Sequence, residues 1–380
     1  MGLYVGLDVS QKQTWICIVD EKGKTVDEGC SLTRASDIYG WLGNRVGHDE
    51  IEKIGLEAGN MSSWLYSGLT KLGLPVACLE AFQAHRFLST QRNKTDKNDA
   101  RGLAQLTRMG EGFLKLVTIR SQGNQEARAL LAMREHLTNQ KVGLENHISG
   151  ILKPFGLIVA RGGVVADVFR ERVIEALCVA EDHGVKIKAM VLPPLDLYRS
   201  ACEQLTALNR QVEALAKDNP ICRRLMTAPG VGPVVALSFY SAIDYPERFK
   251  RGEDVGAYFG LTPRQFQSGQ TDYMVGISKR GDAMVRHHLV TAATVLMTAT
   301  KSWCPLKAWG IRVAKRQGFS KARVAVARKL AVVLYRMWIN GQDFEWKSVP
   351  KEELEGLATS RTHPSGRSEP EGSLQGRKGW

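Results

Sequence analysis

Two aspartates, Asp96 and Asp99, stand three residues apart in the stretch "NKTDKNDARGL" (93–103), where a segment with helical periodicity begins. On a helix, this spacing places both carboxylates on one face, close enough to share a partner. Two like charges held together are destabilising unless a cation or a basic side chain lies between them. The pair is therefore either a salt-bridged helix start or half of a metal site.

Two further carboxylates stand at the ends of predicted strands. The stretch "LYVGLD" alternates apolar side chains and ends at Asp8, and "EKIGLEAG" is a strand that ends near Glu57. Turn residues and periodicity predict the order βββαβαβα up to about residue 100, which is the order of an RNase H-like domain. In that fold the first and fourth strands are neighbours. The helix after the fifth strand can lean over the same edge.

The joint placement of these four carboxylates predicts one divalent-ion site, built from Asp8, Glu57, Asp96 and Asp99. Each has a structural explanation when taken alone, because an acidic helix start is favoured by the helix dipole and an acidic residue at a strand end is common. Carboxylate oxygens are the ligands that Mg2+ prefers in proteins.

The length of 380 residues predicts about two or three domains. We expect a cytoplasmic protein without a membrane segment, because there is no apolar run of about 18 residues and no secretory signal pattern. The seven cysteines are scattered singly, which predicts reduced core thiols and not a disulfide framework or a zinc cluster. His287 and His288 are adjacent, so on a helix they point apart, which favours a structural or phosphate-facing role.

The positive charge is concentrated in the C-terminal part of the chain. The formal net charge is +13, and residues 245–330 hold 16 lysines and arginines against 5 aspartates and glutamates. A region of this kind is typical of binding to a polyanion. Interleaved aromatic residues, Tyr258, Phe259, Phe266 and Tyr273, favour nucleic acid over a merely solvated basic face.

Residues 121–217 have a helical pattern. Leu130, Leu137, Leu144 and Ile151 recur every seventh residue, and a 3-4-3 spacing follows in 205–215. The stretches "RGGVVADVF" and "KIKAMVLPPLDL" are rich in turn residues, so we expect coiled-coil-like arms that run out and back. Such arms either pack on each other or pair two subunits.

The C-terminal part contains two further candidate elements. The turn "PGVG" carries Gly230 and Gly232, whose backbone amides could cradle a phosphate as in helix-hairpin-helix modules, or which only form a tight turn. Two short strands surround "QSGQ", which would expose Ser268, and "SKRGD" leads into a helix with positive charge at its start. A last amphipathic helix with a basic outer face follows, and the residues after Trp346 are expected to be a disordered tail.

The chain also carries six motifs of one known family, in the same order, over roughly residues 1–345. They are "YVGLDVS", "GLEAG", "KTDKNDARGLAQL", "PGVGPVVA", "YFGLTPRQFQSG" and "GISKRGDAMVRHHLV". Together they resemble the DEDD insertion-sequence transposases of the IS110/IS1111 family, the RNA-guided bridge recombinases. By motif matching, the resemblance implies a RuvC-like domain with its acidic residues at Asp8, Glu57, Asp96 and Asp99.

The resemblance also implies a nucleophilic serine in the C-terminal transposase domain, at Ser268. Many relatives read Ser-Gly-Gly where this chain reads Ser268-Gly269-Gln270, and Ser278 is the alternative nucleophile. The implied division is a RuvC-like domain in 1–120, a helical coiled-coil region in 121–217, a transposase domain in 218–345 and a tail in 346–380.

The implied cofactor is Mg2+ or Mn2+, and the implied partners are donor DNA, target DNA and a non-coding bridge RNA that pairs with both. A homo-oligomer, dimer or tetramer, would bring the acidic site of one subunit to the serine of another. A bacterial, nucleoid-associated protein is expected. The residues expected to contact nucleic acid are Lys94, Lys97, Arg101, Arg264, Lys279, Arg280, Arg286, Gly230 and Gly232.

Three other interpretations remain open at the level of sequence. The acidic domain alone suits a structure-specific endonuclease of the Holliday-junction resolvase type, which activates water and needs no serine. The stretch "GLDVSQKQT" resembles the first phosphate loop of actin-like sugar or acetate kinases, although a second loop and an adenosine motif are missing. In a non-catalytic nucleic-acid-binding protein, the carboxylates would merely pair with Lys94, Lys97 and Arg101.

Overall fold

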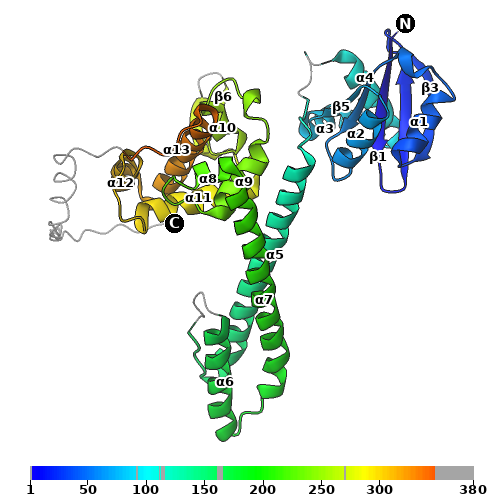
Figure 1. Cartoon of the computed structure of the whole chain (residues 1–380). Coiled ribbons are helices and arrows are strands. Elements are labelled where there is room, and N and C mark those ends of the chain that lie inside the picture. Colours follow the sequence, from blue (N-terminus) through cyan, green and yellow to red (C-terminus); the bar gives the residue numbers. More distant parts are fainter. Residues whose placement is uncertain are drawn as a thin grey trace, which may run out of the picture. The chain divides into compact units, whose positions relative to one another are not determined.

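The computed structural model describes residues 2–90, 93–110, 112, 116–160, 166–268 and 271–346, of which 166, 167, 266–268 and 271–275 are described by backbone only. The chain divides into two units, Met1–Gln122 and Gly123–Trp380 (Figure 1). The predicted disordered tail lies outside the described residues from position 347 onward. The fourfold domain division made from the sequence stays a prediction.

The first unit is built on a five-stranded mixed sheet. The first strand is antiparallel to the second and parallel to the fourth, which is itself parallel to the fifth, in the spatial order β3-β2-β1-β4-β5. The predicted strand order and the predicted pairing of the first and fourth strands are confirmed. The helix predicted directly after the fifth strand, which starts at Asp96, is preceded by a helix at Ala81–Leu88 that was not predicted. The strands are β1 (Leu3–Val9), β2 (Gln13–Val19), β3 (Thr25–Leu32), β4 (Ile51–Glu57) and β5 (Val76–Leu79).

Helices cover both faces of this sheet. Alternation along β1 sends Val5 and Leu7 into a core shared with Ile38 of the first helix and Leu65 of the second. The opposite face carries Cys17 and Val19, which pack against the fourth helix. The helical elements are α1 (Ala35–Gly43), η1 (His48–Glu50), α2 (Ser62–Lys71), α3 (Ala81–Leu88) and α4 (Asp96–Met109).

Two glycines let α4 lie directly on the sheet. A Cβ atom at Gly6 of β1 would collide with the backbone of Ala100 and Ala104, and one at Gly55 of β4 would collide with the side chain of Thr107. Glycine is required where a helix approaches a strand this closely. Because strand side chains alternate, residues two positions after each glycine lie on the same face of the sheet as α4.

The second unit contains two long antiparallel helices, α5 (Gln122–Leu152) and α7 (Lys188–Asp218), with α6 (Ala166–Asp182) between them in the chain (Figure 1). The predicted course out and back is confirmed, because Arg134 Nε donates to Asn209 Oδ1 at 2.7 Å and Tyr198 Oη donates to Glu145 Oε1 at 2.8 Å. Around Tyr198, the three helices enclose a separate apolar core.

One predicted turn in this region is wrong. The stretch "KIKAMVLPPLDL" is mostly helical, since α7 begins at Lys188 and includes Pro193 and Pro194. Both prolines lie in the second turn, where each removes one intrahelical hydrogen bond, a small part of those available to a helix of 31 residues. The turn lies earlier, where Gly184 has a left-handed φ of 80°.

The predicted heptad seam of α5 is only partly buried. Ile148 and Leu152 are fully buried, whereas the heptad residue Ile151 is 37% exposed. Leu215, at the end of the corresponding pattern in α7, is 46% exposed. A coiled coil therefore stays a prediction for these helices.

The rest of the second unit is a helical bundle that carries one hairpin. Its core includes Leu237, Phe239, Leu289, Leu330 and Leu334. The strand pair predicted around "QSGQ" and the helix predicted after "SKRGD" are both confirmed. The elements are α8 (Pro220–Leu225), α9 (Pro233–Ile243), η3 (Pro246–Arg248), α10 (Glu253–Tyr258), β6 (Pro263–Ser268), β7 (Thr271–Ile277), α11 (Ala283–Thr298), α12 (Pro305–Gln317) and α13 (Phe319–Asn340), with η2 (Lys153–Phe155) following α5.

All seven cysteines are free, as predicted, although Cys30 and Cys178 are exposed and so do not belong to a core. Among the described helices, none combines the length and the apolar character that crossing a lipid bilayer requires.

Candidate active site

The parallel pairing of β1 and β4 places two carboxylates side by side. Leu7 is in register with Leu56, so Asp8 and Glu57 are the next residues on each strand, at the same end of the sheet. Asp8 follows Gly6 by two positions and Glu57 follows Gly55 by two, so both lie on the face that α4 covers. Both carboxylates are half-buried.

The first turn of α4 brings two more carboxylates to this place. Thr95 is the N-cap residue, and its Oγ1 accepts a hydrogen bond from the Asn98 N–H at 3.2 Å. The Asp99 N–H donates to the Thr95 carbonyl at 2.9 Å, and the Asn98 side-chain amide donates to the Asn93 carbonyl at 3.0 Å. This cap fixes the turn that holds Asp96 and Asp99, of which Asp99 is buried.

Electrostatics show that the four carboxylates interact. Burial, and after it the nearby charges of Asp96, Asp99 and Glu57, together raise the pKa of Asp8 to about 6. The pKa of Glu57 is also raised, chiefly by burial and additionally by Asp99. The structure therefore brings together the four carboxylates that the sequence singled out. Their roles in metal binding and catalysis stay predictions.

The donor set suits a hard divalent cation. It offers only carboxylate oxygens, and the pKa of Asp8 is raised first by burial and then by the like charges of the other three carboxylates. In the described part of the chain, no three or more His, Cys, Asp or Glu side chains are close enough together, as they stand, to hold a metal ion. Carboxylates on a strand end and a helix start can still converge by changing rotamers.

Lys97 and Arg101 do not pair with the four carboxylates. Both contact Glu28 of β3, with Lys97 Nζ 2.6 Å from Glu28 Oε1 and Arg101 Nε 2.6 Å from Glu28 Oε2. The hydrogen bond from Arg101, followed by that from Lys97, lowers the pKa of Glu28 to about 2. The interpretation in which these two basic residues neutralise the aspartates is therefore wrong. Of the three basic residues considered, Lys94 alone lowers the pKa of both Asp8 and Glu57.

Two residues near Glu57 were missed by the sequence analysis. His85 of α3 lowers the pKa of Glu57 more than any other nearby charge, and Glu80 raises it. Glu80 is also the N-cap of α3, where it accepts from the Phe82 and Gln83 N–H groups. The available signal was topological, because α3 follows β5 and β5 ends beside β4 at the same sheet edge.

Ser268 is the last residue of β6 and is paired with Thr271 of β7. Its side chain, and the whole of Gly269 and Gln270, lie outside the described residues. Arg264 is in β6, in register with Val275. The carboxylates belong to the first unit and Ser268 to the second.

The segment "SKRG" forms backbone hydrogen bonds with the residues that follow α10. The Ser278 N–H donates to the Thr262 carbonyl at 2.9 Å, and the Lys279 N–H donates to the Gly260 carbonyl at 3.2 Å. Lys279 has a left-handed φ of 54°, which is rare outside glycine. Arg280 is exposed beside it.

Arg286 has a structural contact. Its guanidinium donates to the Phe259 carbonyl at 3.1 Å and to the Arg280 carbonyl at 3.2 Å, so it ties α10 to the segment before α11. Phe259 is fully buried, so its predicted contact with nucleic acid is wrong. Tyr258 is half-buried and makes an edge-on contact with Phe249, and its contact with nucleic acid stays a prediction. The side chains of Phe266 and Tyr273 lie outside the described residues.

Gly230 is required for packing. It has a φ of 79°, and a Cβ atom there would collide with the Ala292 carbonyl of α11. Gly232 is the N-cap of α9 and faces open space. The adjacent histidines point apart as predicted, since His287 is exposed while buried His288 bonds Ser238 Oγ at 3.0 Å.

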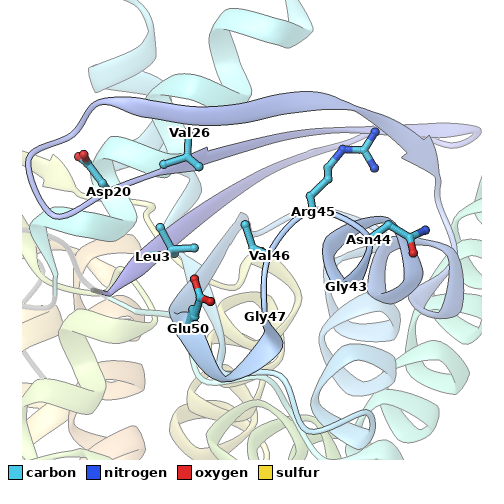
Figure 2. Close-up of a pocket in the computed structure, with 9 residues that line it drawn as sticks. All are labelled: Leu3, Asp20, Val26, Gly43, Asn44, Arg45, Val46, Gly47 and Glu50. Atoms are coloured by element: carbon cyan, nitrogen blue, oxygen red, sulfur yellow. The ribbon is translucent and has the colours of Figure 1, made fainter.

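A hollow of about 600 Å³ lies at the other end of β1 and is not the acidic site. Figure 2 shows its lining, which includes Leu3, Asp20 and Glu50. Arg45 at its rim pairs with Asp27 at 3.0 Å and stacks on Trp41. Leu3 is the first residue of β1 and Asp8 is its last but one, so the hollow and the acidic site lie at opposite ends of this strand.

Two families of known proteins match this chain in separate segments. Residues 5–156 match a transposase family with a DEDD domain, and residues 222–306 match the transposase IS116/IS110/IS902 family. The first segment contains all four carboxylates and the second contains Ser268.

Individual relatives match most of the chain. The transposase for insertion sequence element IS1111A of Coxiella burnetii is 28% identical over 336 residues, which is 88% of this chain and 88% of that protein. The transposase for insertion sequence element IS1328 of Yersinia enterocolitica is 28% identical over 255 residues, covering 66% of this chain and 74% of that protein. A probable family 20 transposase of Pseudomonas aeruginosa is 24% identical over 248 residues, covering 64% and 72% respectively.

An α/β domain with an acidic sheet edge, joined to a second matched segment, thus defines the protein as a DNA transposase. Within that class, the chain belongs to the IS110 family of insertion-sequence transposases.

Proposed function

We propose that this transposase performs metal-dependent, serine-mediated DNA strand exchange guided by a non-coding bridge RNA. The observation that carries the proposal is the convergence of Asp8, Glu57, Asp96 and Asp99 at one end of the sheet, with the pKa of Asp8 raised to about 6. Groups with strongly shifted pKa values and like charges gather at catalytic centres more often than elsewhere.

The strand order of the first unit supports a RuvC-like, RNase H-like assignment. Three antiparallel strands followed by two parallel ones, in the order β3-β2-β1-β4-β5, agree with the arrangement expected from the sequence. The hydrogen bond between Arg134 of α5 and Asn209 of α7 supports the proposal that these two antiparallel helices form the predicted coiled-coil arm.

Asp8, Glu57, Asp96 and Asp99 would hold Mg2+ or Mn2+. The bound ion would supply neutralisation of the charge that develops on a phosphodiester during attack. Asp96 and Asp99, on the capped first turn of α4, would be positioned by Thr95, while the two glycines set their distance from Asp8 and Glu57.

Ser268 would be the nucleophile. Its hydroxyl oxygen would form a bond to a DNA phosphorus while the bond from that phosphorus to a deoxyribose oxygen breaks, and the serine proton would pass to the departing oxygen. The resulting phosphoserine link conserves the energy of the phosphodiester, so rejoining to a second strand needs no ATP. Lys279 and Arg280 would contact phosphates of the DNA backbone.

The partners proposed are donor DNA, target DNA and a bridge RNA, on a dimer or tetramer in which one subunit's carboxylates act with the serine of another. The excess of basic residues in 245–330 supports polyanion binding. Lys94, Arg264 and Lys279 are proposed as backbone contacts, whereas Lys97 and Arg101 would first have to leave Glu28 or bind while paired with it.

A second candidate function is a RuvC-like endonuclease of the Holliday-junction resolvase type. It is favoured by the fact that one unit alone carries all four carboxylates. Such an enzyme would leave hydrolysed ends and no covalent link to protein, so a trapped adduct separates the two.

The proposed function is tested by recombination between two plasmids in vitro. Purified full-length protein should join donor to target only when both a divalent ion and the transcript of the non-coding DNA flanking its gene are present. Product junctions are read by sequencing. Equal recombination without the transcript would contradict RNA guidance, and hydrolysed ends without joined products would favour the endonuclease.

Binding of a divalent ion should weaken as the pH falls through about 6. Protons and the metal compete for Asp8, whose raised pKa places that competition in this range. We expect the apparent affinity for Mn2+ to fall by up to about tenfold per pH unit below the pKa. Calorimetric titration at several pH values measures it, and the remaining affinity of Asp8→Asn should change less with pH, because Glu57 still titrates with a raised pKa. An affinity that does not change with pH would count against Asp8 as a ligand.

A further inference from the structure

The three C-terminal helices form a strongly basic segment. Between Asp282 and Asp343 the sequence contains 11 lysines and arginines and no aspartate or glutamate. Some of these cations have structural contacts. Lys307 is buried and donates to the Thr300 carbonyl, Lys329 lies 4.0 Å from the centre of the Trp309 ring, and Arg336 pairs with Glu253 at 2.8 Å.

A second group of cations lies where α12 meets α13. We define the basic corner as Lys315, Arg316, Phe319, Lys321 and Arg323. Every residue from 315 to 321 is exposed, and Gly318, with a left-handed φ of 84°, makes the sharp turn between the two helices. Figure 1 shows α12 at the margin of the bundle. Among the described residues, no carboxylate forms an ion pair with Arg316, Lys321 or Arg323.

The electrostatics of the basic corner favour an anion. Lys321 and Arg323 lie in the first two turns of α13, where the helix dipole is positive and cations are unfavourable. The N-cap Gly318 provides no side-chain hydrogen bond to the free N–H groups of that turn. A phosphate bound at this place would accept from those groups and neutralise the neighbouring cations.

One apolar side chain in the basic corner indicates the kind of polyanion. Phe319 is 42% exposed and stands between Arg316 and Lys321 in the sequence. Aromatic side chains flanked by cations bind single-stranded nucleic acid, because unpaired bases stack on the ring while the cations contact phosphates. In a duplex the bases are already stacked on each other, so Phe319 would have no partner there.

We propose that the basic corner binds a single-stranded stretch of polynucleotide, with one base stacked on Phe319 and the adjoining phosphates held by Arg316, Lys321 and Arg323. This surface deepens the proposed function and rests on it for the biological origin of the strand, which is either guide RNA or an unpaired DNA strand. The binding itself is a property of these side chains and requires neither the carboxylates nor Ser268.

The test is fluorescence anisotropy with full-length protein in EDTA, using labelled oligonucleotides of about 12 residues as RNA, single-stranded DNA and duplex DNA. Phe319→Ala should weaken binding of a single strand by roughly 5- to 100-fold. Phe155→Ala is the matched control, because Phe155 is 46% exposed and should leave the affinity within about twofold. Circular dichroism and the melting temperature verify that each variant is folded.

A second pair of variants tests the cations. The double variant Arg316→Ala with Lys321→Ala should reduce the slope of log K against log salt by about 1.4, the value for two lost phosphate contacts on a single strand. The charge-matched control is Lys22→Ala with Lys24→Ala, two exposed lysines of the first unit, which should leave the slope unchanged. Tighter binding of the RNA oligonucleotide would assign the basic corner to guide RNA, and tighter binding of single-stranded DNA would assign it to a DNA strand. Either result would support the proposal.

Two results would overturn the proposal. One is equal affinity of Phe319→Ala and Phe155→Ala for every single strand. The other is a loss on Phe319→Ala that is as large for the duplex as for the single strands. Because no catalysis is measured, failure of recombination guided by RNA would leave these outcomes unaffected, so the two hypotheses fail separately.

Discussion

Ser268→Ala is expected to abolish the covalent adduct between this protein and a suicide DNA substrate, with recombination falling by at least about 10³-fold. The alanine lacks the oxygen that would bond to phosphorus, and the carboxylates of the other unit are unchanged, so binding of a divalent ion should persist. The adduct is measured as a DNA-dependent band shift in a denaturing gel, and metal binding by calorimetry.

Ser278→Ala is the matched control, because Ser278 is the other serine in the same region. Its backbone N–H bonds Thr262, and that contact does not require the hydroxyl. We expect this variant to form the adduct. An undiminished adduct with Ser268→Ala would refute its assignment as nucleophile, and an adduct lost only in Ser278→Ala would transfer the role to Ser278.

Asp8→Asn is expected to remove metal-dependent activity while making the metal-free protein more stable. Folding raises the pKa of Asp8 from 3.8 to about 6, so the folded state binds that proton more tightly than the unfolded state does. The ionised side chain therefore lowers the free energy of unfolding above about pH 6, and this cost disappears as the pH falls below about 4. With allowance for its partial exposure, a neutral asparagine should add about 1–2 kcal/mol at neutral pH.

The measurements are denaturant unfolding in EDTA at several pH values and a metal-dependent adduct assay. Asp49→Asn, at an exposed carboxylate of the same unit, serves as the control and should change neither quantity. Asp99→Asn should also remove activity. Full activity of Asp8→Asn or Asp99→Asn would show that the substituted residue does not belong to the catalytic site. A lower stability of Asp8→Asn than of the unsubstituted protein would contradict the electrostatic account.

The acidic site was predictable from the sequence because strand ends and helix starts are encoded locally. Alternation in "LYVGLD" fixes the face and end of Asp8, and the pairing of strands one and four follows from the order of elements. Glu57 and the start of α4 were placed by the same reasoning. The signal that α4 lies directly on the sheet was also present, in Gly6 and Gly55, but a glycine in a strand has several explanations.

Contacts between distant segments could not be predicted. Glu28 lies about seventy residues before Lys97 and Arg101, and nothing in the sequence around Glu28 indicates that it pairs with these two residues in place of the aspartates. Likewise Phe259 is an aromatic residue in a basic region of the sequence, which suggested contact with nucleic acid. Its burial results from tertiary packing, which the local sequence does not indicate. In "KIKAMVLPPLDL", the prolines suggested a turn, but packing of Leu195 and Tyr198 against α5 and α6 outweighs their helix-breaking tendency.

RNA guidance, the serine nucleophile and assembly into a dimer or tetramer are predictions that rest on family resemblance and not on the pattern of residues. The chain does supply the physical ingredients in separate places: an acidic edge in the first unit, and a basic region with an exposed serine-bearing hairpin predicted in the second.

The most direct test is the anomalous scattering of Mn2+ in crystals of the full-length protein. The account predicts a peak about 2.1 Å from a carboxylate oxygen of Asp8 and from oxygens of at least two of Glu57, Asp96 and Asp99. A Mn2+ ion ordered elsewhere in the molecule, with these four side chains making no contact to it, would contradict the account.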